Sequence, residues 1–332
     1  MILVTGGAGY IGSQAVLELS ENNYDVVVFD NLETGHIEVI TAIQQVFPAV
    51  KFVKGDLRNF EEINKVFKDF EIDSVMHFAA NSIVGESVLD PQKYYYNNVF
   101  GSMNLFKSMI ENNVKKLVFS STCAVYGEPE YVPIDELHPK NPVNPYGASK
   151  LMIERILEDY DSAYALKSVR LRYFNVAGAD KNARVGEWHD NETHLIPNIL
   201  KSTFKKSDKF QIYGDDYDTK DGTCIRDYVN IEDLVDAHIL ALEYLNKKNQ
   251  SDVFNIGTSF GNSVKEVFDL CENILGHNID YEICPRRLGD PDKLFAETKK
   301  ANELLGWQSK RRLDYSIKTA YEWEKKLQSN IN

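Results

Sequence analysis

Residues 4–12 read Val4-Thr5-Gly6-Gly7-Ala8-Gly9-Tyr10-Ile11-Gly12, and they stand between a short apolar run and an amphipathic run. This pattern is typical of a strand that turns into a helix. At such a turn the free N–H groups and the dipole of the helix point at one place, which favours a pyrophosphate. Gly6 suits the tight turn, Gly9 allows close approach to phosphate oxygens, and Gly12 allows the helix to pack closely on the strand.

A second apolar run, Val26 to Phe29, follows that helix and ends at Asp30. An acid at this place accepts hydrogen bonds from both hydroxyls of an adenosine ribose and repels a ribose 2′-phosphate, so NAD is favoured over NADP. The alternative is a glycine-rich turn chosen only for packing. It is the weaker interpretation, because strand, glycines, helix and acid occur in order.

The composition limits the partners that we expect. The chain has 332 residues and a net charge of −13, which disfavours nucleic acid and anionic membranes. No run is long enough to span a bilayer and no leader pattern is visible, so we expect a cytoplasmic protein. Its four cysteines are far apart, and the acidic loop at Asp215 to Asp218 lacks the spacing of a calcium loop. We therefore expect no metal.

Strand and helix patterns alternate through the first half of the chain and predict an α/β fold. We expect a Rossmann-type doubly wound parallel sheet with a smaller, interleaved C-terminal substrate lobe. Residues 1–176 would form the NAD-binding domain and 177–332 mainly the substrate lobe, with segments around 226–260 crossing back. The further strands that we expect are Lys51–Val53, Ser74–Phe78, Lys116–Ser120, Val169–Phe174 and Val253–Ile256, and the helices are 59–70, 91–112 and 145–164.

Two further strand ends carry polar or small residues. Asp56 follows the third strand, where it could meet the adenine amino group or, as an equal alternative, cap the next helix. His77-Phe78-Ala79-Ala80 ends the fourth strand, and its small residues allow the backbone to approach a cofactor. We interpret His77 as a buried side chain with its hydrogen bonds satisfied.

The chemistry is expected at Asn144-Pro145-Tyr146-Gly147-Ala148-Ser149-Lys150. Asn144 is a good N-cap and Pro145 a good first helical residue. Tyr146 and Lys150 then share a helix face, where an ammonium group and a nicotinamide cation would lower the pKa of the phenol and make it a base. An exposed tyrosine and a solvated lysine are the bland alternative. The hydroxyls of Ser120-Ser121-Thr122 at the end of the preceding strand weigh against it.

Together, the glycine turn, the Ser120-Ser121-Thr122 strand end and the Tyr146/Lys150 pair resemble the extended short-chain dehydrogenase/reductase family. Over nearly the whole chain the resemblance is to its UDP-glucose 4-epimerase branch. The motifs that carry it, from both lobes and in order, are Asp30-Asn31-Leu32, Val84 to Ser87, Tyr94 to Asn98, Val125-Tyr126-Gly127, Leu171 to Asn175, Gly222 to Tyr228 and Pro285 to Pro291.

The resemblance implies a role for each matching position. Tyr146 would be the catalytic base, Lys150 its electrostatic partner and a ligand of the nicotinamide ribose, and Thr122 the hydroxyl that steadies the sugar O4. The cofactor residues implied are Gly6, Gly9, Tyr10, Ile11, Gly12, Asp30, Asn31, Asp56, Leu57, Phe78, Ala79, Ala80, Asn97, Ser120, Tyr146, Lys150 and Phe174. The substrate residues implied are Thr122, Tyr146, Asn175, His194, Leu195, Gln211, Ile212, Tyr213, Arg226, Arg287, Asp290 and Leu294.

Within that set the implied contacts differ. Asn175, Arg226 and Arg287 would hold the diphosphate, a role that suits guanidinium groups. Asp290 would accept from the uridine ribose. Residues 211–213 would line the uracil pocket, His194 would contact the substrate, and Leu294 would lie near the sugar.

The implied reaction interconverts UDP-galactose and UDP-glucose. The C4 position is oxidised with tightly held NAD, the 4-ketose rotates, and the hydride returns to its other face. The resemblance also implies a homodimer packed through helices around 91–112 and 145–164.

Two positions depart from relatives and leave questions open. Asn81-Ser82 stands where many relatives have a lysine, which puts cofactor affinity in doubt. Leu294 stands where some epimerases have a tyrosine, so a UDP-N-acetylglucosamine 4-epimerase or a dual specificity stays open.

Two other functions are disfavoured. A 4,6-dehydratase would be expected to have Thr-Asp-Glu at the end of this strand, an acid and a base for the loss of water. This chain has Thr122-Cys123-Ala124 there instead. A non-catalytic NAD-sensing regulator would be expected to lose the Tyr146/Lys150 pair.

Overall fold

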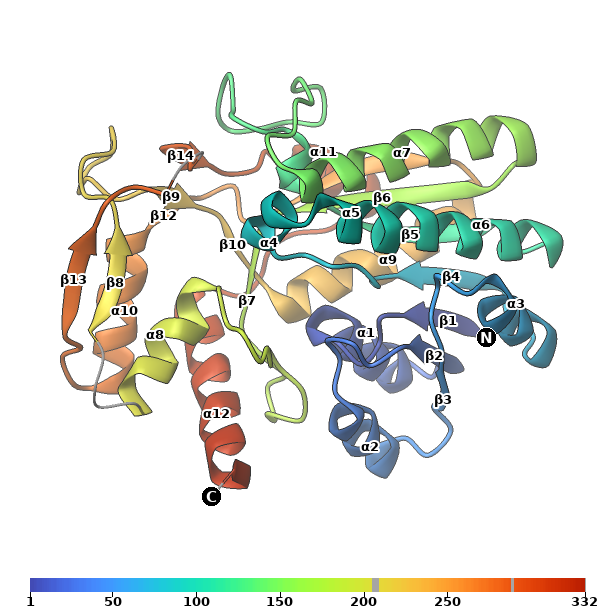
Figure 1. Ribbon diagram of the computed structural model, residues 1–332, viewed down its shortest axis with the longest axis horizontal. Helices are drawn as coiled ribbons and strands as arrows, with labels where there is room; N and C mark the ends of the chain where they lie inside the picture. The colour runs from blue at the N-terminus through green and yellow to red at the C-terminus, as the bar shows by residue number, and fades with distance from the viewer. Residues whose placement is uncertain (205–208, 288–289, 332) are drawn as a thin grey trace.

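The computed structural model describes residues 1–204, 209–287 and 290–331, and its centre is a seven-stranded parallel sheet (Figure 1). The strand order is β11-β6-β5-β4-β1-β2-β3, and every pairing is parallel. The expected doubly wound fold is therefore confirmed. The strands are β1 (Ile2–Thr5), β2 (Val26–Asp30), β3 (Lys51–Lys54), β4 (Ser74–His77), β5 (Lys116–Thr122), β6 (Lys167–Tyr173) and β11 (Asp252–Ile256).

The central strands are apolar because both faces of the sheet are covered. Leu3 and Val27 pack into one core cluster, whereas their neighbours Val4 and Val28 pack into the other. This alternation follows from the two-residue period of a strand. The helices on the Val4 side are α1 (Tyr10–Glu21), α2 (Ile37–Val46), α9 (Ile231–Lys248) and α11 (Lys299–Leu305), and those on the Leu3 side are α3 (Phe60–Asp69), α6 (Gly101–Glu111) and α7 (Pro145–Tyr164).

Helix α7 has the bounds that the sequence predicts. Pro145 is its first residue, and the side chain of Asn144 accepts a hydrogen bond from the N–H of Gly147. The helix expected over 91–112 is instead three consecutive pieces, α5 (Pro91–Tyr94), a π-helical segment η1 (Tyr95–Phe100) and α6. The π-helical segment was not predicted, because such a turn depends on tertiary contacts such as those of Asn98 rather than on a local sequence signal. A short helix α4 (Val84–Leu89) precedes them, and a 3₁₀ turn η2 (Cys123–Val125) follows β5.

The later part of the chain forms three small sheets and three helices beside the large sheet (Figure 1). Helices α8 (Leu195–Phe204), α10 (Val264–Leu275) and α12 (Leu313–Ile331) share one apolar core with β8. The small sheets pair β7 (Asn175–Ala177) with β10 (Tyr228–Asn230), β8 (Phe210–Tyr213) with β13 (Tyr281–Cys284), and β9 (Ile225–Arg226) with both β12 (Asn262–Ser263) and β14 (Lys293–Leu294). Strand β11 then returns to the large sheet, next to β6.

The carboxyl ends of the parallel strands bring the sequence motifs to one edge of the large sheet. The glycine turn follows β1, Asp30 ends β2, and Thr122 ends β5. Strand β1 lies between β2 and β4. From β1 the strand order runs outward through β2 and β3 on one side and through β4 and β5 on the other, so it reverses direction at β1. Ligands of open parallel sheets bind at such a switch point. Among the described residues, no helix is long and apolar enough to cross a membrane.

Candidate active site

The turn between β1 and α1 exposes backbone rather than side chains at the start of α1, because its residues include Gly6, Gly9 and Gly12. Gly6 has φ of +73°, and a Cβ there would lie 2.5 Å from the N of Ala79. A Cβ on Gly12 would lie 2.1 Å from the carbonyl oxygen of Gly6. The N-cap of α1 is Gly9, and no side chain caps the helix. The first N–H groups of α1 are thus exposed to a ligand, which fits a phosphate.

Neighbouring residues of the turn connect it to the rest of the molecule. The hydroxyl of Tyr10 donates to the carbonyl oxygen of Gly178 at 2.6 Å, which ties the turn to the segment after β7. Ile11 packs against the core on the α1 side of the sheet.

Two carboxylates stand at the ends of β2 and β3. Asp30 accepts from the N–H groups of Ala8 and Leu32 at 3.0 and 2.8 Å, and burial raises its pKa. Asn31 donates to the carboxylate of Asp56 at 3.0 Å.

The helix-capping alternative for Asp56 is wrong. Asn59 caps α3, and Asp56 instead pairs with the guanidinium of Arg58. The pKa of Asp56 is lowered, because this hydrogen bonding and the arginine charge outweigh partial burial. Next to it, the carbonyl oxygen of Leu57 accepts from Asn104 at 2.9 Å.

The segment after β4 lies against the glycine turn. Ala79 donates its N–H to the carbonyl oxygen of Thr5, and Ala80 follows it. His77 is buried between the hydroxyls of Thr5 and Ser102 at 2.7 and 2.8 Å, so its interpretation as a satisfied core residue is confirmed. The Phe78 ring lies 4.8 Å from that of His238 on α9.

An asparagine cluster supports this segment from the π-helix. Asn98 accepts from the N–H of Asn81 at 2.8 Å and from the side chain of Asn97 at 3.0 Å. The Nδ2 atom of Asn81 is buried and has no hydrogen-bond partner among the described residues. It is therefore a donor available to a polar ligand, next to the exposed Ser82.

Tyr146 and Lys150 lie in the first turns of α7, beside the end of β5. The ammonium of Lys150 donates to the carbonyl oxygen of Ser120 at 2.8 Å and lies 6.0 Å from the centre of the Tyr146 ring. A side-chain hydrogen bond with Thr122 acts on the Tyr146 phenol. The structure thus brings the base, the lysine and the hydroxyl expected from sequence to one place.

Burial dominates the ionisation of both groups. It raises the pKa of Tyr146 well above its usual range and lowers that of Lys150 to about 7. The sequence predicted a lowered pKa for the phenol, and here the loss of hydration outweighs the hydrogen bond from Thr122. A phenolate in this position therefore needs an additional positive charge close by.

A buried ionic network behind the strand end holds α7 on the sheet. The guanidinium of Arg172 on β6 makes two hydrogen bonds to Glu154 on α7, at 2.9 and 2.5 Å, and Ser121 donates to the same carboxylate at 2.6 Å. Arg172 also donates to the hydroxyl of Tyr126, which donates to Asn255. Sequence reasoning missed this network, because its members come from four separate segments.

A second group of predicted residues gathers in the smaller lobe around Arg226. Its Nη1 donates to the carbonyl oxygens of Ile225 and Pro291, whereas its Nη2 lies 3.3 Å from Asp290 without the geometry of a hydrogen bond. The register of β9 and β14 places Leu294 beside Arg226. Leu294 packs against a cluster that includes Cys123 and Phe174.

Tyr217 belongs to the same group and was not predicted. Its hydroxyl is buried without a partner among the described residues, and the charges of Asp290 and Arg226 act on it. Two buried donors that make no hydrogen bond within the described part of the chain, this hydroxyl and Arg226 Nη2, are suited to an anion. In the sequence, its only mark is an aromatic residue within the acidic loop Asp215 to Asp218.

A third group lies on β8. The guanidinium of Arg287 lies 4.2 Å from the centre of the Tyr213 ring, and the Tyr213 hydroxyl donates to Gln211 at 2.7 Å. The side chain of Ile212 is buried in the core of the smaller lobe, so a ligand could meet only its backbone. Leu288 and Gly289 of the neighbouring motif lie outside the described residues.

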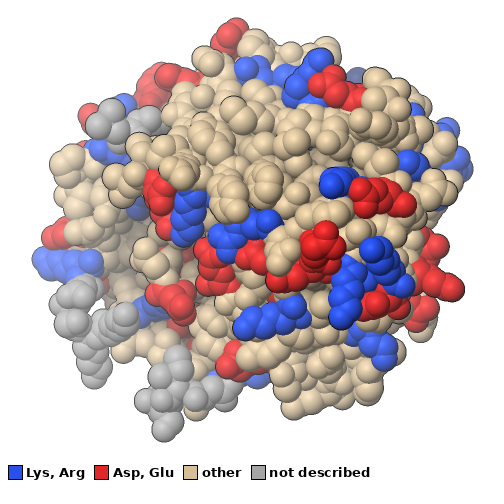
Figure 2. Space-filling view, turned by 45° about the vertical axis from the view of Figure 1, so that its right-hand side comes forward, with Lys and Arg blue, Asp and Glu red and all other residues tan. Residues whose placement is uncertain are grey.

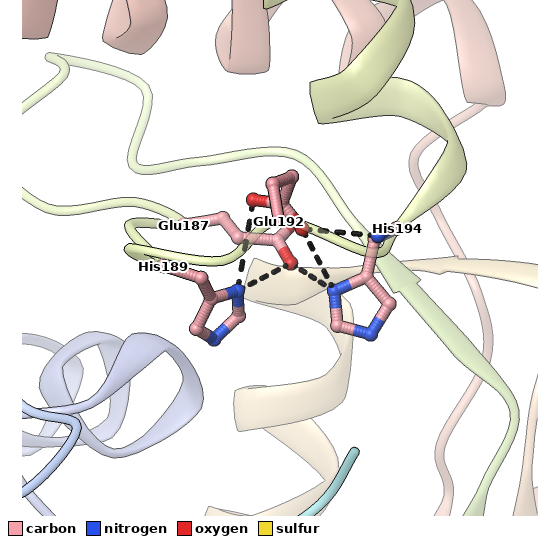
Figure 3. A group of neighbouring side chains, drawn as sticks. All are labelled: Glu187, His189, Glu192 and His194. Carbon is pink, nitrogen blue, oxygen red and sulfur yellow. Dashed lines mark hydrogen bonds and ion pairs between the residues drawn. The ribbon is translucent and has the colours of Figure 1, made fainter. Parts of the chain in front are cut away.

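The backbone connects the first two groups across the lobes. Tyr173 pairs with Thr122 in the sheet, and Phe174 and exposed Asn175 follow it. The N–H of Asn175 donates to the carbonyl oxygen of Asp227, the residue after Arg226. His194 stands apart, before Leu195 at the start of α8, in a cluster with two glutamates (Figure 3).

Fold and site together define a nicotinamide-dependent protein of the short-chain dehydrogenase type. The glycine turn, Asp30 and the Tyr146/Lys150 pair lie at the carboxyl edge of one doubly wound sheet. The sequence model of the NAD dependent epimerase/dehydratase family matches residues 2–257.

Individual relatives narrow the class. A UDP-glucose 4-epimerase of Lactobacillus helveticus is 51% identical over 98% of this chain and 97% of its own. A crystal structure of UDP-glucose-4-epimerase from Stenotrophomonas maltophila, with bound NAD and formylated UDP-arabinopyranose, has a TM-score of 0.96 at 36% identity and covers 99% of both chains. The UDP-Glc/GlcNAc 4-epimerase of Campylobacter jejuni has a TM-score of 0.86 at 42% identity, covering 98% of this chain and 99% of its own. The chain belongs to the UDP-glucose 4-epimerases of the NAD dependent epimerase/dehydratase family.

Proposed function

We propose that this protein interconverts UDP-galactose and UDP-glucose by inverting the sugar at C4, with NAD as a bound cofactor. The observation that carries the proposal is the convergence of Tyr146, Lys150 and Thr122 at the same edge of the sheet as the glycine turn, in a chain of this family. The UDP-N-acetylglucosamine alternative is the less favoured one, since the curated relatives at 42–51% identity are UDP-glucose 4-epimerases.

The residues present fit NAD. The start of α1 offers uncapped N–H groups, Asp30 at the end of β2 would accept from the adenosine ribose, and Asn81 Nδ2 is a buried donor without a partner among the described residues. These residues, with Asp56 and Lys150, would hold the dinucleotide. When bound, NAD would accept and return the reducing equivalent at the sugar C4, and its oxidised ring would supply the positive charge that the site lacks.

Tyr146 would take the proton of the 4-hydroxyl and, after the sugar has turned, return a proton to the same oxygen, O4. Burial alone holds the phenol protonated. A nearby cation reverses that preference, because it stabilises the phenolate. Thr122 would keep the sugar O4 within reach of the phenol, and Lys150, fixed to the Ser120 carbonyl, would hold its charge close to the tyrosine.

Besides proton transfer by Tyr146, inversion at C4 requires that the nucleotide stay bound while the sugar turns. The buried donors of Arg226 and Tyr217 are suited to the diphosphate, which Arg287 would also contact, and Tyr213, against which Arg287 packs, would belong to the uracil pocket. The sugar end is bounded by Leu294, which offers only van der Waals contact. Strong polar anchoring at one end and weak apolar contact at the other would allow the flat 4-ketose to present either face.

Incubation of the purified protein with UDP-galactose, followed by chromatography of the nucleotide sugars, tests the proposal. We expect UDP-glucose to form without added NAD. An absorbance spectrum of the purified protein should show bound nicotinamide. A protein that binds nicotinamide and forms no UDP-glucose would be a sensor rather than an epimerase.

We further propose that the protein is a homodimer that associates through α6, η1 and α7. Tyr96, Phe100 and Met103 follow one another on one face of η1 and α6 and are 53%, 42% and 40% exposed, and Met152 on α7 is 46% exposed. Figure 2 shows a broad area without charged side chains over the upper part of the molecule, where Figure 1 places α6 and α7. An apolar face of this kind favours a second copy of the chain.

Light scattering during size-exclusion chromatography tests the dimer. Met103→Glu should give a monomer, whereas Leu304→Glu, a change at an exposed leucine on α11, should not. An unchanged mass for Met103→Glu would place the interface elsewhere. We also expect the protein to work in the cytoplasm, because its four cysteines are free thiols and a reducing compartment keeps them so.

A further inference from the structure

Four metal-ligating side chains converge on one point outside the proposed active site. Glu187, His189, Glu192 and His194 lie in the segment between β7 and α8, and one ligand atom from each lies within 4.8 Å of all the others (Figure 3). Both histidines present Nδ1 to the two carboxylates, and the second nitrogen of each ring lies on the side away from them (Figure 3).

Three of the four nitrogen–oxygen contacts in this group have lengths near the edge of a tetrahedron around a metal ion, whereas the fourth, between His194 and Glu187, is a shorter hydrogen bond that a bound ion would replace. Nδ1 of His189 lies 3.3 Å from Glu187 and 3.6 Å from Glu192, and Nδ1 of His194 lies 3.5 Å from Glu192. A fourth contact joins His194 to Glu187. Zinc bonds of 2.0–2.1 Å in a tetrahedral site put neighbouring ligand atoms about 3.4 Å apart.

The charges and burial of the group also favour a cation. The side chains of Glu187 and Glu192 are only 6% and 5% exposed, so two carboxylates share a site with little water. Lys201 lies 3.3 Å from Glu192 and supplies one positive charge nearby. With neutral imidazoles the two carboxylates and Lys201 together carry a net charge of −1, which attracts a divalent cation.

The surroundings hold the ligands in place. The N–H groups of Thr193 and His194 donate to Glu192 at 2.9 and 3.0 Å, which orients that carboxylate. The indole of Trp323 on α12 donates to the carbonyl oxygen of Glu187 at 2.8 Å. Such outer contacts are typical of metal sites. The side chains of His189 and His194 are 30% and 56% exposed, which leaves a path for the ion.

We propose that Glu187, His189, Glu192 and His194 form a site for one divalent transition-metal ion of the zinc type. Imidazole nitrogens with carboxylate oxygens suit zinc, whereas calcium and magnesium prefer sites made of oxygen alone. Four protein ligands from one short segment close the coordination sphere, as in structural zinc sites. The site therefore fixes this segment and takes no part in the redox chemistry.

The proposed metal site lies in a segment that contacts both the large domain and the smaller lobe. The Trp188 side chain between the ligands stacks on His36, with ring centres 3.8 Å apart, so the segment touches the large domain at the start of α2. The segment leads directly into α8 of the smaller lobe. A bound ion would fix His194 and Leu195, which the resemblance implies as substrate residues. That consequence for the substrate rests on the proposed function, whereas the metal site itself does not.

The test uses the untagged full-length protein, stripped with a chelator and then titrated with Zn²⁺, Mg²⁺ or Ca²⁺. We expect about one zinc ion per chain by elemental analysis and a higher melting temperature with Zn²⁺ only. Co²⁺ should give the intense visible bands of a tetrahedral site. His189→Gln and Glu192→Gln should each lower zinc affinity at least ~10-fold, and His277→Gln, at an exposed histidine elsewhere, should not.

The possible outcomes are distinct. Loss of the Co²⁺ bands in His189→Gln, with circular dichroism unchanged, supports the site. If the wild-type protein neither retains zinc nor shifts its melting temperature with it, the four side chains are an ion-pair cluster and the proposal is wrong. Metal content and melting are read without UDP-sugar, so failure of the epimerase proposal would leave this result unaffected.

Discussion

Tyr146 is the residue at which the structure and the proposed chemistry meet most directly. Its phenol is buried, and burial holds its pKa high, while Thr122 and Lys150 stand close by. A group that is protonated on its own and becomes a base beside a positive charge is suited to act only when substrate and oxidised cofactor are both in place.

Tyr146→Phe should keep the fold and the bound nicotinamide but lower turnover at least ~10²-fold, the usual scale for a positioned acid–base group. Steady-state epimerisation of UDP-galactose measures the turnover, and the absorbance spectrum measures the cofactor. Tyr164→Phe, a change at an exposed position of the same helix, is the matched control. Near-normal turnover of Tyr146→Phe would remove the tyrosine from the mechanism.

His77 should make stability depend on pH. Burial, with the charge of Lys150, lowers its pKa to about 3. Between that value and its ordinary pKa of about 6.5 the unfolded chain binds a proton that the folded chain does not, so stability falls as the pH falls below 6.5. His238, with a pKa lowered to about 4 by burial, acts in the same direction.

Denaturant unfolding at pH 7.5 and 5.5 measures this effect. Between these two values, His77→Gln should lose about 1.4 kcal/mol less stability than the wild type does. His277→Gln, at an exposed position, serves as the control. An equal pH slope in wild type and His77→Gln would mean that His77 is not held neutral in the folded protein.

At the scale of elements, the position of α7 on β5 and β6 depends on a buried ion pair. Glu154 and Arg172 are each about 2% exposed, and the arginine makes two hydrogen bonds to the carboxylate. The pKa of Glu154 is lowered, because these bonds and the charge of Arg172 outweigh burial. Removal of one partner leaves the other charge buried without compensation.

Glu154→Gln should therefore lower the free energy of unfolding by about 3–5 kcal/mol, and it should lower turnover by displacing the first turns of α7. Urea unfolding measures the first effect and the epimerisation rate the second. Asp159→Asn, at an exposed acid on the same helix, should change neither by much. A stability loss under ~0.5 kcal/mol would contradict the role of the pair.

Much of the element structure could be predicted from the sequence. Every residue of β1, β2 and β4 is buried, and β1 and β2 are mostly apolar runs, whereas Asn144 with Pro145 marks the start of α7 without tertiary information. The π-helix η1 and the three small sheets could not be predicted in the same way. The π-helix depends on contacts such as those of Asn98, and the small sheets on pairings between strands of two to four residues. Strands this short are too few residues long to show an alternation of apolar and polar side chains.

At the scale of the whole molecule, the site is formed by segments that the chain brings together from both lobes. The residues at the carboxyl edge of the sheet could be predicted because each ends its own strand. The pairing of Arg226 with Leu294 and the buried hydroxyl of Tyr217 could not be predicted from the sequence, because they depend on contacts between distant segments. The spacing of Glu187, His189, Glu192 and His194 within eight residues is a signal that could have been read.

The substrate range is a property of both lobes, since Leu294 on β14 packs against Cys123 and Phe174 next to the large sheet. Leu294→Tyr should suppress any activity on UDP-N-acetylgalactosamine and spare UDP-galactose, because the larger ring fills the space of an acetamido group. Apolar pockets discriminate by only about 1–3 kcal/mol per methylene-sized change, so leucine itself should shift a preference. Rates on both substrates, in wild type and mutant, measure the effect. If the two proteins treat the acetamido sugar alike, another residue sets the range.

The central claim is that C4 is oxidised and then reduced within one closed site. UDP-galactose that carries deuterium at C4 tests it most directly, with the purified protein, no added cofactor, and mass and NMR analysis of the product. We expect UDP-glucose that keeps its deuterium at C4, because the same hydrogen leaves and returns. A UDP-glucose product whose C4 hydrogen has exchanged with water, or no UDP-glucose at all, would contradict the account.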